Sequence, residues 1–230
     1  MGGDAGTVSA SGATGVQVSS DFWVERFDTG IHICQLFSNE DDRLDSMAHY
    51  LASGIAAGQK CGCCTLDDAP LGDAQSALGA HLASSNLTSS GLSVKDACIS
   101  GQLSFVEADN VLLTDGRFDP ERLLSRLSEF CDSARGEGWS GALIVAEISP
   151  AIPEVTGGGR LIEFEVEVNR LLLDRLLLDR PMAIVCQYDL RRFDGAILMD
   201  VLRVHPFIMI RGSVMRNPFH LSAENALAAA

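Results

Sequence analysis

Polar side chains stand where several apolar runs of this 230-residue chain end. Hydroxyls, amides and carboxylates can hydrogen-bond a small molecule, and a tyrosine adds an apolar face. Because the carboxyl ends of parallel strands meet at one edge of a sheet, we expect these side chains to line one crevice and bind a ligand there. The candidate ligand-binding residues are Ser38, Asn39, Asp67, Glu107, Glu147, Gln187 and Tyr188.

Glu147 has the most specific position among these candidates. It ends the apolar run 142–146, where an ATPase built on a parallel sheet carries its metal-binding acid. The alternative is a strand-end carboxylate that pairs with Arg191 or Arg192. The sequence leaves both interpretations open.

The loop after the first apolar run lacks the features of a phosphate-binding loop. Residues 38–42, SNEDD, contain no glycine and no lysine. The three carboxylates suit the start of a helix but would repel a triphosphate. We therefore expect no nucleotide binding at this loop, and no enzymatic activity.

The seven cysteines and five histidines raise the question of a metal site. Cys61 and Cys63 are two residues apart in a predicted strand, whereas structural zinc sites mostly use Cys-x2-Cys knuckles on turns. Cysteine is also among the residues most often buried in cores. None of the histidines stands in a known catalytic motif. We expect no metal ion and no cofactor, with structural roles for these residues.

The elements that must position the candidates form an alternating pattern. Apolar runs typical of buried parallel strands alternate with segments of helical period, which predicts an α/β fold with a mainly parallel sheet and helices on both faces. The predicted strands are Ile31 to Phe37, Cys61 to Leu66, Leu103 to Glu107, Ala142 to Ile148, Met182 to Tyr188 and Phe207 to Ile210.

Helix starts are indicated by capping residues. Ser38 with Asp41 predicts a helix that ends before Gly58, and Asp119 followed by Pro120 opens another. Further helices are predicted from Arg160 to Leu173 and from Gly195 to Val204. Residues 1–20 read as a flexible tail, 21–222 as one domain and 223–230 as a C-terminal tail. The glycines and prolines of residues 149–159 predict a mobile loop that orders when a ligand binds.

Composition restricts the partners and the compartment. With 17 basic and 31 acidic residues the formal charge is -14, so direct nucleic-acid or membrane binding is not expected. Neither a signal peptide nor a membrane span is visible. An odd number of cysteines indicates reduced thiols, and we expect a cytoplasmic protein.

Several stretches, in order, resemble the MEDS sensory domain, a family named for methanogens, methylotrophs and a dichloromethane-responsive repressor. They are HICQLF at 32–37, LASGIAAGQKC at 51–61, GRFDPER at 116–122, LIEFE at 161–165 and CQYD at 186–189. The resemblance covers residues 30–219. It implies a RecA-like fold of the circadian-clock ATPase type with a degenerate phosphate loop, and a role as an input domain for small carbon compounds. Residues 146–150 lack the aromatic that the family usually has.

These observations predict a non-catalytic sensory or regulatory domain. It would bind a small-molecule ligand and relay the signal to a protein partner in transcription or signalling, and a homodimer is left open. A protein-interaction module without a ligand is the first alternative, and the acidic surface would suit it. A hydrolase that uses the strand-end carboxylates is the second.

Overall fold

A seven-stranded sheet forms the centre of the computed structural model, which describes residues 16–20, 23–27, 30–66, 71–84, 93–177, 181–210 and 213–229. The strand order is β11-β10-β3-β9-β8-β4-β5, and all neighbours are parallel except β10 and β11. The strands are β3 (Ile31–Phe37), β4 (Lys60–Thr65), β5 (Leu103–Glu107), β8 (Ala142–Glu147), β9 (Met182–Asp189), β10 (Phe207–Ile210) and β11 (Ser213–Arg216). The predicted parallel strands are thus confirmed.

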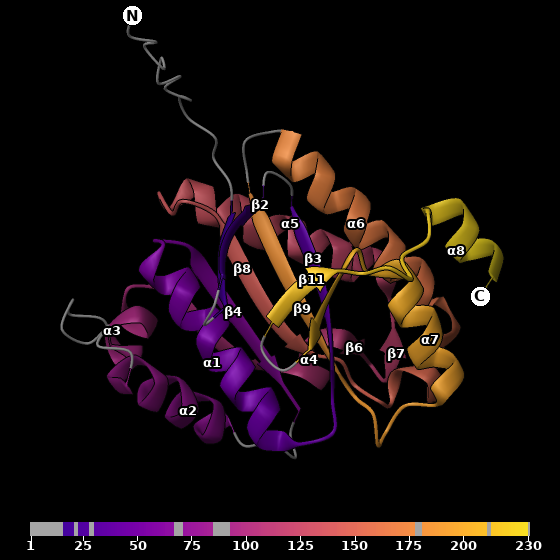
Figure 1. Ribbon diagram of the computed structural model, residues 1–230, viewed down its shortest axis with the longest axis horizontal. Coiled ribbons are helices and arrows are strands. Elements are labelled where there is room, and N and C mark those ends of the chain that lie inside the picture. Colours follow the sequence, from indigo (N-terminus) through magenta and orange to yellow (C-terminus); the bar gives the residue numbers. More distant parts are fainter. Residues whose placement is uncertain are drawn as a thin grey trace, which may run out of the picture.

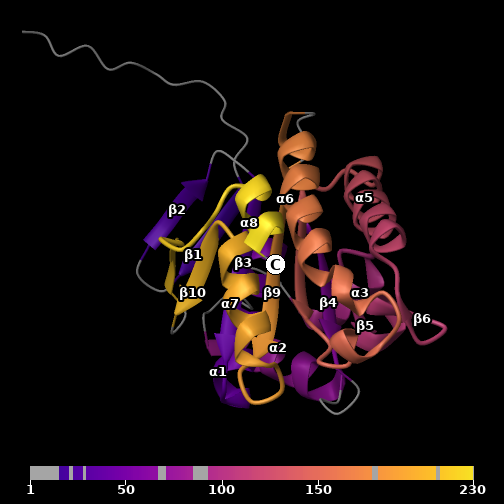
Figure 2. The same cartoon turned by 90° about the vertical axis from the view of Figure 1, so that its right-hand side faces the viewer.

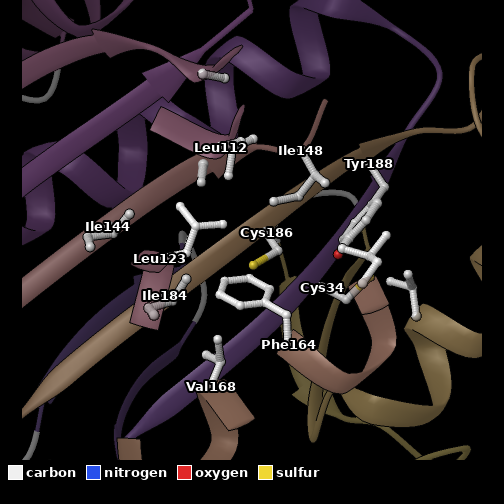
Figure 3. Packing of buried hydrophobic residues seen from close by; sticks show 14 of the residues in the cluster. Cys34, Leu112, Leu123, Ile144, Ile148, Phe164, Val168, Ile184, Cys186 and Tyr188 are labelled. Carbon is white, nitrogen blue, oxygen red and sulfur yellow. The ribbon is translucent and has the colours of Figure 1, made fainter. Parts of the chain in front are cut away.

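Helices cover both faces of this sheet (Figures 1 and 2). The α1 face carries α1 (Glu40–Ala56) and α2 (Leu71–Ser84), with α3 (Val94–Ile99) beside the edge strand β5. The α6 face carries α5 (Pro120–Gly136), α6 (Leu161–Leu177) and α7 (Gly195–Val204). Each face buries its own apolar core, and Figure 3 shows part of the core on the α6 face, where Cys186 and Tyr188 lie near Phe164. The predicted α/β class is confirmed.

The helix starts follow the capping residues with one correction. Asn39, and not Ser38, is the N-cap of α1, because the Asn39 side chain accepts a hydrogen bond from the Asp41 backbone N–H at 3.0 Å. At α5 the prediction holds, since the Asp119 carboxylate accepts from the Arg122 N–H at 3.0 Å and Pro120 follows. These contacts satisfy N–H groups that a helix leaves unpaired in its first turn.

Smaller elements surround the sheet. The hairpin of β1 (Val16–Ser20) and β2 (Trp23–Phe27) begins inside the segment predicted to be a tail, whose first 15 residues lie outside the described residues. The others are α4 (Ala108–Leu112), β6 (Leu113–Thr114), β7 (Arg117–Phe118), the 3-10 turns η2 (Ile152–Glu154) and η3 (Gly158–Arg160), and α8 (Ala223–Ala229). In the described part of the chain, no helix is long and apolar enough to cross a membrane.

The segment 149–159 is packed and contains η2 and the first two residues of η3. Ile152 is fully buried. A Cβ atom added at Gly157, where φ is +90°, would lie 2.2 Å from the Phe118 carbonyl oxygen, and one at Gly158 would lie 1.7 Å from that of Ile152. Close backbone approach therefore explains these two glycines, which the sequence had suggested as marks of mobility.

Candidate functional site

A buried polar layer lies on the α1 face at the carboxyl ends of the central strands. Glu147 of β8 is paired in register with Gln187 of β9, which is paired with Gln35 of β3. All three side chains are buried. Gln187 Nε2 donates to Gln35 Oε1 at 2.7 Å and to the Arg43 carbonyl oxygen at 3.2 Å. As predicted, Glu147 and Gln187 are neighbours at the carboxyl ends of adjacent strands.

The side chain of Arg43 is buried against this polar layer. Arg43 comes from the first turns of α1, and its side chain has 0% exposure. Its Nη1 lies 3.3 Å from Glu147 Oε2, and its Nε donates to Glu40 Oε1 at 2.9 Å. Burial opposes the charge, yet hydrogen bonding to Glu40 and attraction to Glu147 raise the pKa of Arg43. Glu147 is thus part of an ion pair, as the alternative interpretation held, but its partner is Arg43. Arg191 instead contacts Asp189 at 2.7 Å.

The remaining candidates lie elsewhere. Ser38 and Asn39 are exposed, and Asn39 serves as the α1 cap. Glu107 is half-buried and accepts a hydrogen bond from Asn110 at 2.6 Å. Asp67 lies outside the described residues. Tyr188 was expected beside Gln187, but it packs in the core on the α6 face, because adjacent residues of a strand point to opposite faces.

A second buried cluster lies around Tyr188 on the α6 face. It joins His32 of β3, Glu165 of α6, Cys186 of β9 and His205, which follows α7. One ligand atom from each residue lies within 4.8 Å of all the others. His32 Nε2 is 3.1 Å from Glu165 Oε2 and 3.4 Å from Cys186 Sγ. Every member is at most 2% exposed.

Two oxygen acceptors fix the orientation of the histidine rings. His32 Nδ1 lies 3.1 Å from Asn169 Oδ1, and the Asn169 amide is held because its Nδ2 donates to the Val204 carbonyl oxygen at 2.8 Å. His205 Nδ1 lies 2.8 Å from the Val201 carbonyl oxygen, so Nδ1 carries the proton. The Nε2 atoms of both rings face Glu165. His205 Nε2 is 3.6 Å from Glu165 Oε2 and makes no hydrogen bond among the described residues.

Burial and mutual interaction shift the ionisation of this cluster. Burial lowers the pKa of His205 to about 3, so its imidazole is neutral at pH 7. Burial and the neighbouring Glu165 charge raise the pKa of the Cys186 thiol and of Tyr188. Although burial opposes its charge, the contacts with His32, His205 and Tyr188 lower the pKa of Glu165. The Tyr188 hydroxyl donates to Glu165 Oε1. An ionised carboxylate thus stands inside the protein beside two imidazole rings, a thiol and a phenol.

The sequence analysis missed this cluster by interpreting every histidine as structural. One signal was present, since His32 is an ionisable residue inside the predicted buried strand IHICQLF. The cysteines considered for a metal, Cys61 and Cys63, lie on the α1 face and are buried in its core, as expected.

Comparisons with known proteins agree with this fold. The chain is similar in structure to the flagellar accessory protein FlaH from Methanocaldococcus jannaschii, with a TM-score of 0.51 and 11% identity over 81% of this chain and 75% of that one. A KaiC-like protein from Pyrococcus horikoshii OT3 gives a TM-score of 0.50 and 11% identity over 80% and 71%. These likenesses show a RecA-like fold.

A search of curated proteins found no match to the chain. The profile of the MEDS family, described as the methanogen/methylotroph, DcmR sensory domain, matches residues 31–206. This match covers most of the chain and most of the central sheet. The protein therefore belongs to the MEDS family of sensory domains.

Proposed function

We propose that this sensory domain is non-catalytic, binds a small neutral carbon compound in the polar layer on the α1 face, and relays the signal to a protein partner in the cytoplasm. The observation that carries the proposal is the buried Arg43 side chain in the polar layer at the carboxyl ends of the central strands. Family membership supports the sensory role. The seven cysteines are free thiols, which supports a reducing compartment.

Charge favours a neutral ligand over a nucleotide. Glu147 stands where an ATPase would hold its magnesium ion, but here it contacts Arg43. Arg43 is already balanced by two carboxylates, Glu40 and Glu147. A phosphate group would add negative charge to this site, so its binding is disfavoured.

Two polar atoms in the layer could donate hydrogen bonds to the oxygen of a bound compound. Thr65 Oγ1 is buried and makes no hydrogen bond among the described residues, and Arg43 Nη1 has a 3.3 Å ion-pair contact with Glu147 but no hydrogen bond there. Cys63, two residues before Thr65, contacts Met47 of α1, so Thr65 shares the α1 face. A small alcohol, aldehyde or amide carries an oxygen that accepts from such donors, and its carbon part suits the apolar surroundings.

Thermal shift and native mass spectrometry test this proposal. We expect stabilisation by at least one compound from a panel of small alcohols, aldehydes and amides, and none by ATP with magnesium. The isosteric change Thr65→Val should abolish the stabilisation, whereas Thr156→Val, at an exposed position, should retain it. Binding of ATP that Glu147→Gln alters would contradict the proposal. A protein that binds no compound but captures a defined partner would favour the interaction module.

A further inference from the structure

The buried cluster on the α6 face carries an inference that does not depend on the proposed function, because it rests on other residues on the opposite face of the sheet. Its geometry points to a closed zinc site formed by His32, Glu165, Cys186 and His205. The sequence analysis expected no metal, because it weighed Cys61, Cys63 and Cys64 with His32 and Cys34 and rejected that set on its spacing.

The arrangement of lone pairs is the first argument. His32 and His205 each direct Nδ1 to an oxygen acceptor, so both Nε2 atoms face the Glu165 carboxylate. A nitrogen lone pair and a carboxylate oxygen repel each other unless a proton or a metal ion lies between them. A metal ion bound to both would remove this repulsion. It would also supply the partner that His205 Nε2 lacks among the described residues.

The separations of the ligand atoms are the second argument. With bonds of about 2.0–2.3 Å, a tetrahedral zinc ion holds its nitrogen, oxygen and sulfur ligands about 3.3–3.6 Å apart. Here Glu165 Oε2 lies 3.1 Å from His32 Nε2, 3.6 Å from His205 Nε2 and 4.0 Å from Cys186 Sγ. Small side-chain adjustments would therefore complete the coordination.

The surroundings have the form expected of a metal site. Metal-binding histidines usually donate their second N–H to an oxygen, and both rings face such acceptors, the Asn169 side chain and the Val201 carbonyl. Tyr188 hydrogen-bonds the carboxylate oxygen that faces away from His32. Two imidazoles, one thiolate and one carboxylate are a donor set that suits zinc.

The number and burial of the ligands indicate a structural zinc site and not a catalytic one. Four protein ligands fill a tetrahedral sphere, and all four side chains are at most 2% exposed, so no position remains for a substrate. The ion would have a structural role. It would connect β3, α6 and β9 to the segment between α7 and β10, and so hold the C-terminal part of the chain to the centre of the sheet.

Metal analysis of the full chain tests the inference. We expect one zinc ion per chain after refolding with zinc and removal of excess metal. Cys186→Ser and His205→Gln should lose the ion. The matched changes Cys61→Ser, at a buried strand cysteine on the α1 face, and His81→Gln, on α2, should retain it. Equal zinc content in all four variants would overturn the assignment.

Cobalt substitution of the unmodified protein gives an answer even where a variant fails to fold. We expect the strong visible bands of tetrahedral cobalt with a thiolate-to-cobalt charge-transfer band, and loss of that band in Cys186→Ser. The positioning change Asn169→Ala should keep the band and weaken metal affinity on the order of 10- to 100-fold. A folded protein that binds neither zinc nor cobalt would show that the cluster is a protonated hydrogen-bond network only.

Discussion

At the scale of single residues, the buried ion pair of Arg43 and Glu147 is the main electrostatic feature of the polar layer on the α1 face. A buried pair contributes little net stability, because both charges lose their hydration. Removing only one partner is costly, since it leaves the other charge buried without compensation. A substitution at Arg43 or at Glu147 alone is therefore expected to destabilise the protein more than replacement of both residues.

The difference between removing one partner of the ion pair and removing both can be tested. Glu147→Gln should lower the free energy of unfolding by about 1–3 kcal/mol, less than for a fully unpaired buried charge because Arg43 keeps its contact with Glu40, and the double variant Arg43→Met with Glu147→Leu should recover most of the loss. Urea unfolding of both variants measures this. Glu167→Gln, at a surface pair with Arg170, is the control and should show no measurable change. A double variant as unstable as Glu147→Gln would argue against the ion-pair explanation.

Sequence patterns identified some site residues and could not identify others. Glu147 and Gln187 were found because each ends an apolar strand. Arg43 was not found, because a helix residue gives no sign of which strand-end carboxylate it will contact. His32 and Asn169 are 137 positions apart and meet only through the packing of α6 on β3. Contacts of this kind depend on the register of the elements, which local sequence does not contain.

At the scale of elements, the clearest apolar runs gave the correct strands. The helix α2 was missed because its sequence, LGDAQSALGAHLAS, has two glycines and few large apolar residues. The turns η2 and η3 were missed for a related reason. Their glycines suggested a mobile loop, although the backbone there packs too closely for a side chain at two of the three positions.

The three consecutive glycines offer an internal comparison. Gly157→Ala and Gly158→Ala should each destabilise the protein by about 1–3 kcal/mol, because the new Cβ would meet a carbonyl oxygen. Gly159→Ala meets nothing within 4 Å and should be neutral or stabilising by about 0.4–1 kcal/mol. Thermal unfolding of the three variants checks the order. Equal tolerance at all three positions would mean that this segment is not packed.

At the scale of the whole molecule, the C-terminal helix α8 packs on the domain. Ala226 is buried in a small cluster with Val166 of α6 and Val204 of α7. The segment 223–230 was predicted to be a short tail, and its contact with α6 and α7 extends the α6 face. Because only one small side chain is buried, this docking contributes modestly to stability.

The size of this contribution can be measured. Removal of residues 223–230 should lower the free energy of unfolding by about 1 kcal/mol, near the value for burying one methyl group. Ala226→Asp should cost the same, because the helix can undock instead of burying a carboxylate. Asn225→Asp, at an exposed position, serves as the control. A loss several times larger in urea unfolding would make α8 an integral part of the core.

The alternation of side chains along β9 has a consequence for communication across the protein. Cys186, Gln187 and Tyr188 are consecutive, yet the middle residue belongs to the polar layer and the outer two to the opposite cluster. A shift of this strand along its axis must displace both clusters by the same amount, because one stretch of backbone carries them. If binding at either proposed site shifts β9, the residues of the other site must move with it. The central strand β9 is thus the physical connection between the two proposed sites.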